Sequence, residues 1–251
     1  MKIHNPSPSD IPMLRDLWKE AFGDTDEFLD VFFSTAFDTD RSLCITKDNK
    51  IVSALYWFDC YVGCEKSAYI YAVATAVSHR SQGLCRKLMD KTHLLLKDKS
   101  YAGAVLVPCS KSLFDFYEKL GYKTCSYVDE FKTKADKGYT FIEEINADEF
   151  AKLRRKHLPE NAVIQEGENL KFLSAFAKFY KGDDFLLVSY KEKDILHIKE
   201  FFGNKEKLAS ITNTLGAKES LCRTTGSTNP FSMYYPLKST ASPSYFGLAF
   251  D

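Results

Sequence analysis

Apolar and polar side chains recur with two different periods in the first part of the chain. Residues 2–4 predict a short strand, and apolar side chains then follow the period of a helix over residues 11–21. Gly23 is expected to end this helix. Phenylalanine and leucine side chains over residues 28–37 predict a second helix, which begins at one of the polar residues 24–26. The chain therefore opens with a strand and two helices.

The pattern then changes to strands that two helices interrupt. Stretches rich in β-branched and aromatic residues are separated by turn residues such as those at 47–50, which is typical of hairpins. Leucines at helical spacing follow, and then a short, continuously apolar stretch that is typical of a buried strand. We expect strands at residues 42–46, 51–61, 68–77 and 104–107, helices at 81–96 and 110–120, and closing strands at 122–127 and 130–133.

The second half of the chain repeats part of this pattern after a polar segment at residues 133–138. A predicted strand at 139–145 and a predicted helix at 147–157 resemble the start of the chain, and a predicted hairpin at 185–202 resembles the earlier one. A helix at 205–215 and strands at 221–224, 231–236 and 245–250 follow. We interpret the halves as two related α/β units, residues 1–135 and 136–251, with an unrelated α+β cap after the first unit as the alternative.

Composition and charge narrow the classes of function. The 251 residues include 34 Lys and Arg and 34 Asp and Glu, so the chain lacks the broad basic surface that nucleic-acid binding usually needs. It contains no signal core and no apolar run of roughly 18 residues. We therefore expect a cytoplasmic protein without nucleic-acid or membrane partners. The seven cysteines form no Cys-x-x-Cys pair, which favours reduced thiols and no metal site.

The loop between the strand at 68–77 and the helix at 81–96 carries the candidate chemistry. The first N–H groups of a helix suit a phosphate, and Gly83 lets the backbone approach an anion closely. Arg80 and Arg86 add positive charge. The loop has neither the Gly-x-x-x-x-Gly-Lys-Ser/Thr pattern of a P-loop nor the Gly-x-Gly-x-x-Gly pattern of a dinucleotide site.

Two motifs resemble signatures of the GNAT superfamily of N-acetyltransferases. Arg80-x-x-Gly83-x-Cys85 resembles its pyrophosphate loop, Arg/Gln-x-x-Gly-x-Gly/Ala, and residues 114–122 resemble its helix that ends in Tyr-Glu-Lys-Leu-Gly-Phe. The order of predicted elements over the first 133 residues also agrees with the family. Cys85 departs from the small Gly or Ala of the family loop, and Val77 stands where the family usually has Pro.

The resemblance implies an α/β (α+β) fold, with a mixed, mostly antiparallel sheet flanked by helices. It also implies that the second half is a smaller, degenerate GNAT-like unit. The expected activity is that of an acyltransferase. Acetyl-CoA would be its co-substrate, no metal would be needed, and the acetyl group would pass to a primary amine of a small-molecule or peptidic acceptor.

The resemblance further implies roles for individual residues. Backbone groups of Val73, Ala74 and Thr75 would pair with the pantetheine arm and stabilise the oxyanion on the thioester carbonyl. Tyr117 would protonate the leaving CoA thiolate, and Ser112 on the same helix would contact the cofactor. The diphosphate would be held by Arg80, Ser81, Gln82, Gly83, Leu84, Cys85 and Arg86.

The general base stays open at this point, because several residues near the predicted cleft have suitable chemistry. Carboxylates and a histidine would accept the proton directly, whereas a tyrosine would relay it through water. The candidates are Asp59, Glu65, Glu130, His197 and Glu200, a relay through Tyr69 or Tyr71, and the terminal carboxylate of Asp251.

The second half lacks the loop motif. Only Gly-Asn-Lys-Glu, residues 203–206, separates its long predicted strand from the next helix, so we expect it to bind no acetyl-CoA. It would instead close the acceptor cleft or complete the sheet. The polar stretch from Arg223 to Phe231 is a candidate acceptor-binding loop, with an ordinary surface loop as the alternative.

Two other functions remain as alternatives. A non-catalytic acyl-CoA-binding or regulatory module would keep the fold without turnover, whereas Tyr117 favours an enzyme. An aminoacyl transferase with paired GNAT-like units would need an extended basic groove for charged tRNA, and the balanced charge of the chain argues against such a groove.

Overall fold

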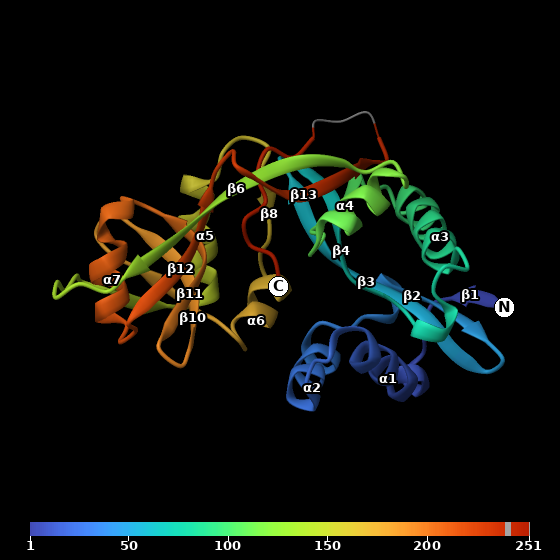
Figure 1. Ribbon diagram of the computed structural model, residues 1–251. Helices are drawn as coiled ribbons and strands as arrows, with labels where there is room; N and C mark the ends of the chain where they lie inside the picture. Colours follow the sequence, from blue (N-terminus) through green and yellow to red (C-terminus); the bar gives the residue numbers. More distant parts are fainter. Residues whose placement is uncertain (239–241, 251) are drawn as a thin grey trace. The chain divides into compact units, whose positions relative to one another are not determined.

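Figure 1 shows the computed structural model, which describes residues 1–238 and 242–250. The chain forms a mixed α/β fold with mostly antiparallel strands, and it divides into two compact units. The first unit contains Met1–Leu106, Ser110–Lys123 and a return segment that begins at Tyr234. The second contains Val107–Cys109, Thr124–Met233 and the segment from Ser242 onward. A division at residue 135 does not include this return of the chain to the first unit.

The first unit orders its strands β1-β2-β3-β4-β5. Neighbours are antiparallel except β4 and β5, which are parallel because α3 connects them. The strands are β1 (Lys2–His4), β2 (Ser42–Lys47), β3 (Lys50–Val62), β4 (Glu65–Thr75) and β5 (Gly103–Leu106), and the helices are α1 (Ile11–Phe22), α2 (Asp26–Thr35), α3 (Leu84–Asp98) and α4 (Lys111–Glu118).

Cap and turn residues set several of these boundaries. Gly23 ends α1 in the left-handed region, with a φ of 75°. The Thr25 side chain accepts a hydrogen bond from the backbone N–H of Phe28 and so begins α2. Asp48 and Asn49 take φ values of 50° and 60°, which the tight turn between β2 and β3 requires.

Helices cover both faces of this sheet, with α1 and α2 on one side and α3 and α4 on the other (Figure 1). On the α1 side, the Trp18 ring centroid lies 4.6 Å from that of Phe32, 5.3 Å from that of Tyr56 and 5.8 Å from that of Tyr71. These rings join both helices to β3 and β4. An aromatic core therefore holds β4, the strand that leads into the candidate loop.

The second unit orders its strands β6-β12-β11-β10-β9-β7, with β13 beside β6. Strands β11 and β12 are parallel and α7 connects them, whereas β12 with β6, β11 with β10, β10 with β9 and β9 with β7 are antiparallel. The strands are β6 (Lys123–Lys134), β7 (Glu143–Ile145), β8 (Val163–Ile164), β9 (Lys178–Lys181), β10 (Leu186–Glu192), β11 (Ile195–Phe202), β12 (Glu219–Thr225) and β13 (Asn229–Pro236), and the helices are α5 (Ala147–His157), α6 (Glu168–Leu173) and α7 (Leu208–Thr214).

The core of the second unit lies on both faces of β10. Leu186 and Val188 belong to one apolar cluster with Phe150 of α5. Leu187, between them, points to the opposite face and packs in a second cluster with Leu208 of α7. Successive side chains of a strand point to opposite faces, so the three successive apolar residues at the start of β10 fill the cores on both of its faces.

The two units share one strand order. In the sheet, β7, β9, β10, β11 and β12 follow one another as β1, β2, β3, β4 and β5 do, and only the last pair is parallel in each. Each unit has two α-helices after its first strand and one between its last two strands. This agreement supports the interpretation that the second unit repeats the first.

Some predicted elements were wrong in extent or kind. The closing strands at 122–127 and 130–133 form one continuous strand, β6. The predicted strand at 245–250 is an extended segment with one isolated bridge, Tyr245 to Ala162. The predicted strand at 139–145 is limited to β7. Helix α6 and strand β9 were not predicted, because six and four residues are too few to show a clear period.

Candidate active site

A bulge interrupts β4 at the residues predicted to face the thioester. Tyr71 pairs with Tyr56 and Ala74 pairs with Ala54, so one extra residue of β4 is accommodated between these pairs. Ala72 takes a φ of 47°, in the left-handed region that residues other than glycine seldom adopt. Such a bulge turns backbone groups out of the ladder. Val73 and Ala74 therefore lie where the strand changes direction.

Strand β4 also parts from β5 ahead of the bulge. Their parallel pairing covers Ala68 with Ala104 and Tyr69 with Val105, whereas β4 continues to Thr75. Ile70 is buried, but Tyr71 and Val73 are only half-buried. The last part of β4 thus presents an edge to which an extended chain can add, as a strand adds to a sheet.

Side chains hold the end of β4 in place. The Ser53 hydroxyl donates a hydrogen bond of 2.7 Å to the carbonyl oxygen of Ala74, and its oxygen lies 2.8 Å from the Thr75 hydroxyl. The Glu20 carboxylate accepts a 3.2 Å bond from the backbone N–H of Val77. Sequence reasoning missed Ser53 and Glu20, because neither lies near a motif.

The candidate loop leads directly into α3. After a short 3-10 turn at Val77–His79, Ser81 and Gly83 take φ values of 61° and 73°, and Gly83 forms the N-cap. Among the described residues, no side chain caps this end of α3. A Cβ added to Gly83 would meet no atom of the described chain within 4 Å. The first N–H groups of the helix therefore open onto free space beside an exposed glycine, which suits a diphosphate.

The polar side chains of the loop and of the first turn of α3 bond to different backbone carbonyl groups. Arg80 Nε donates a 3.1 Å bond to the carbonyl oxygen of Thr75, and Gln82 Nε2 donates a 3.3 Å bond to that of Ser78. Arg86 Nη2 donates a 3.2 Å bond to the carbonyl oxygen of Lys119, at the end of α4. The roles of Arg80, Gln82 and Arg86 toward a diphosphate stay predictions.

Cys85 is a protonated thiol at neutral pH. Burial raises its pKa to about 11, which outweighs the opposite effect of Arg86. Leu84 beside it is buried and anchors the helix, whereas Ser81 is exposed. A thiol of this kind is a poor nucleophile at neutral pH.

Tyr117 lies near the end of α4 and is buried, with 7% of its surface exposed. Its ring meets those of Phe116 and Tyr122 edge to face, at 5.2 Å and 5.7 Å. Its carbonyl oxygen accepts bonds from the N–H groups of Leu120 and Tyr122. Ser112 is exposed in the first turn of α4, 3.0 Å from the Ser110 hydroxyl.

The candidate bases of the first unit differ in their surroundings. Asp59 accepts a 2.5 Å bond from the Tyr101 hydroxyl and forms a 2.8 Å ion pair with Lys66. Glu65 is exposed at the first position of β4. Tyr69 and Tyr71 lie side by side on β4, with ring centroids 6.0 Å apart. The partners of Asp59 make it a structural carboxylate.

In the second unit, Glu200 is fully buried and committed to structure. Arg154 donates two bonds to it, of 2.6 Å and 2.9 Å, and the Tyr245 hydroxyl donates a third, of 2.9 Å. A carboxylate whose oxygens are already held by three such donors is a poor acceptor for a proton from a substrate. Glu200 therefore serves the fold of this unit, and Asp251 lies outside the described residues.

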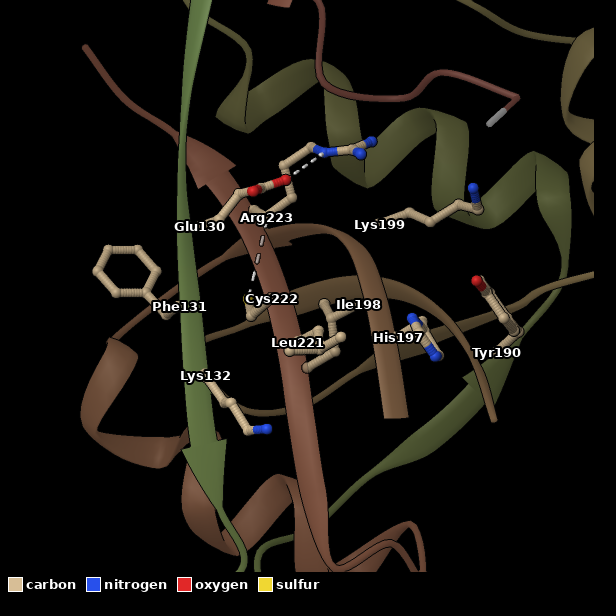
Figure 2. Close-up of a pocket in the computed structure, with 10 residues that line it drawn as sticks. All are labelled: Glu130, Phe131, Lys132, Tyr190, His197, Ile198, Lys199, Leu221, Cys222 and Arg223. Carbon is tan, nitrogen blue, oxygen red and sulfur yellow. Dashed lines mark hydrogen bonds and ion pairs between the residues drawn. The ribbon is translucent and has the colours of Figure 1, made fainter. Parts of the chain in front are cut away.

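Figure 2 shows an open groove on the sheet of the second unit, about 400 Å³ in volume. It brings together three residues singled out in the sequence, Glu130, His197 and Arg223. Its walls come from four neighbouring strands, with Glu130, Phe131, Lys132, Tyr190, His197, Ile198, Lys199, Leu221, Cys222 and Arg223 as the lining residues.

Several polar side chains of this groove contact aromatic rings. The His197 ring stacks on Tyr190 at 4.6 Å, and the Lys199 ammonium lies 5.6 Å from the same tyrosine ring. Arg223 stands over the Phe231 ring at 4.4 Å, with Nε 3.8 Å from Glu130. Sequence reasoning missed Tyr190 and Lys199, which carry no motif.

The predicted acceptor loop from Arg223 to Phe231 is mostly strand. It consists of the end of β12, a short turn and the start of β13. The Asp129 carboxylate accepts 3.1 Å bonds from the N–H groups of Ser227 and Thr228 and fixes the turn. The role of residues 223–231 in acceptor binding stays a prediction.

Within residues 1–238 and 242–250, no group of three or more His, Cys, Asp or Glu side chains is placed to hold a metal ion. No helix in this part of the chain combines the length and apolar character that crossing a membrane requires. The cytoplasmic location stays a prediction.

Comparisons with known proteins agree with this geometry. The family described as acetyltransferase (GNAT) domain matches residues 2–125. Among solved structures, a GCN5-related N-acetyltransferase from Anabaena variabilis superimposes with a TM-score of 0.73 and 14% identity, over 94% of this chain and 73% of that one. A GCN5-related N-acetyltransferase from Kribbella flavida superimposes with a TM-score of 0.69 and 16% identity, over 94% of this chain and 72% of that one.

A third solved structure, a putative acetyltransferase from Pyrococcus horikoshii, gives a TM-score of 0.68 and 14% identity, over 98% of this chain and 91% of that one. At these identities the structures establish a shared fold. Among curated protein sequences, none matches the chain. The residues that carry the bulge, the loop before α3 and Tyr117 all lie within the part of the chain that matches the GNAT acetyltransferase domain family.

Proposed function

We propose that the chain is an acetyl-CoA-dependent N-acetyltransferase that acts on a primary amine of a small-molecule or peptidic acceptor. One observation carries the proposal. The bulged, half-buried edge of β4 runs straight into an α3 start that no described side chain caps. An extended thioester arm that ends in a diphosphate has the shape to lie along the edge of β4 and to place its diphosphate at the start of α3.

The residues of this region fit such a molecule. Backbone groups of Val73 and Thr75 pair with the pantetheine arm along the free part of β4, and the N–H groups from Ser81 to Arg86 surround the diphosphate. Gly83 leaves room for it, because its position is open and exposed. The small side chain of Cys85 replaces the Gly or Ala of the family loop without blocking the helix start.

The chemistry needs an oxyanion site and an acid. The amine nitrogen attacks the thioester carbonyl carbon, and N–H groups at the β4 bulge, near Val73 and Ala74, stabilise the oxyanion that forms. The carbon–sulfur bond then breaks, and the CoA sulfur takes a proton from the Tyr117 hydroxyl. The amine nitrogen releases one proton to solvent and Tyr117 regains one from solvent, so that the transfer is balanced and Tyr117 is restored.

The second unit is proposed to be a degenerate GNAT-like unit. Its strand order, its parallel β11–β12 pair and its bulge support this reading. It lacks the Arg-x-x-Gly loop, and η4 (Lys205–Lys207) leads from β11 to a short α7 of seven residues. We therefore assign the cofactor to the first unit alone.

A thiol-release assay tests the proposal. Wild-type protein is mixed with acetyl-CoA and a panel of amines, beside Tyr117→Phe and, as a matched control, Tyr122→Phe. We expect release with at least one amine, and a kcat roughly 10- to 1000-fold lower for Tyr117→Phe with unchanged acetyl-CoA affinity. Tight CoA binding without release by any amine would favour the non-catalytic alternative.

A further inference from the structure

The second unit has a strand opening of its own. The parallel pairing of β11 with β12 ends at Ile198 and Cys222, although β11 continues to Phe202. Beyond this point β12 pairs only with β6, as far as Thr225 with Val128. The register of β11 against β10 also shifts here, at Lys199. These are the two features that mark the candidate cofactor site on β4.

The C-terminal segment lies against the β11 side of this opening. The Tyr245 hydroxyl donates a 2.9 Å bond to Glu200, and the Tyr245 ring meets that of Phe202 at 6.3 Å. The carbonyl oxygen of Tyr245 accepts a 2.8 Å bond from the N–H of Val163. Both Glu200 and Phe202 come after the residue at which β11 leaves β12.

The same segment contacts the other side of the opening. The Phe246 ring lies 6.4 Å from that of Phe231 on β13, and Ala249 belongs to a buried cluster with Phe231 and Val128. Val128 is the β6 residue that pairs with the last residue of β12. Residues 245–249 thus extend from the free half of β11 to β6 and β13.

Residues 245–249 are almost completely buried in the strand opening of the second unit. Tyr245, Phe246, Leu248 and Ala249 are each at most 2% exposed. A Cβ on Gly247 would stand 1.8 Å from the Tyr245 hydroxyl oxygen and 2.9 Å from a Glu200 carboxylate oxygen. No side chain fits there, so the fit depends on glycine.

We infer that residues 245–249 are the built-in occupant of the second unit's strand opening. They take the place that, on the proposed function, the arm of acetyl-CoA takes beside β4. Because the chain's own segment fills this opening, the second unit has no room there for a ligand, and each chain binds one CoA.

Hydrogen–deuterium exchange on the full-length chain tests this inference, with Gly247→Ala compared with wild type. The added methyl group expels the segment, so we expect exchange at Glu200, Phe201 and Phe202 to rise about tenfold or more. Ser242→Ala, an exposed position in the same segment, is the matched control and should behave like wild type. Unchanged exchange in Gly247→Ala would overturn the inference.

Two further measurements keep the test decisive. If Gly247→Ala does not fold, Tyr245→Phe removes only the hydroxyl bond to Glu200 and should give a smaller rise at the same amides. Calorimetric titration with CoA should find one site per wild-type chain, and two would contradict the inference. Absence of CoA binding together with the expected exchange pattern would refute the proposed function and leave the role of the segment standing.

Discussion

Arg86 Nη2 donates a hydrogen bond of 3.2 Å to the carbonyl oxygen of Lys119. This bond joins the first turn of α3, which begins at the candidate diphosphate site, to the end of α4, two residues after Tyr117. A guanidinium beside the last carbonyl groups of a helix also offsets their partial negative charge. Arg86 therefore connects the helix that would bind the cofactor with the helix that would supply the proton.

Replacing Arg86 by alanine should lower kcat more than it raises the KM for acetyl-CoA. The side chain is turned toward α4, so its loss releases the end of the helix that positions Tyr117. We expect a fall in kcat of about 3- to 30-fold in steady-state assays. Lys87→Ala removes the neighbouring exposed cation and is the control. A change confined to KM would show that Arg86 acts on the diphosphate instead.

Gly83→Glu should abolish CoA binding while the fold is kept. A carboxylate at this position puts negative charge and bulk where the diphosphate is proposed to lie, and an equilibrium titration should show a loss of affinity of about 100-fold or more. Gly23 is a matched control, because it has nearly the same backbone angles at the end of α1 and equally open surroundings. Gly23→Glu carries the same backbone strain and should bind CoA like wild type.

Glu200→Ala should strongly destabilise the second unit. It leaves the Arg154 guanidinium buried without its carboxylate, which typically costs about 3–5 kcal/mol of unfolding free energy in denaturant titrations. The exposed pair of Arg155 and Glu166 uses the next residue of the same helix. Glu166→Ala should therefore cost at most about 1 kcal/mol. Equal losses in both variants would contradict the structural role assigned to Glu200.

Stability should fall in mildly acid solution because of His93. Burial lowers the pKa of this histidine from 6.5 to about 4, against the opposite effect of Asp90. As the pH falls, His93 therefore becomes protonated near pH 6.5 in the unfolded chain but only near pH 4 in the folded chain. The contribution of neutral His93 to the free energy of unfolding is fully present above pH 6.5. It is lost as the pH falls to 4, which lowers the free energy of unfolding by about 3 kcal/mol.

Denaturant titrations between pH 7.5 and 4 check this prediction. His93→Gln should flatten the dependence on pH, because glutamine keeps a polar group near the Tyr122 hydroxyl but does not titrate. His79→Gln, a change in the half-exposed loop, should leave the slope as in wild type. A wild-type curve that does not fall below pH 6.5 would contradict the assignment.

Elements with a strong period could be predicted from the sequence. The strand at 195–202 and the helix at 147–157 have the predicted bounds, because their apolar spacing and flanking turns agree. The loop before α3 was also found, since it needs glycine and arginine at fixed positions. Local sequence patterns are sufficient to predict an element whose structure is decided by residues close to it in the sequence.

Contacts between distant residues could not be predicted in this way. The bulge at Ala72 has no marker in the composition of β4, and the partners of Asp59 come from the start of β4 and from a later loop. Burial of Glu200 depends on Arg154 and Tyr245, which are 46 and 45 residues away. Glu200 could be named as a candidate base because the sequence does not reveal which carboxylates are already paired.

The return of β13 to the first unit has a consequence for synthesis of the protein. The Tyr235 ring stacks on His93 at 4.0 Å, and the Tyr234 ring occupies the space that a side chain at Gly103 would need. The amino-terminal unit therefore cannot complete its packing on the ribosome until residue 235 has emerged. A polypeptide that stops at residue 135 would lack these rings, and we expect it to be captured by chaperones rather than to fold alone.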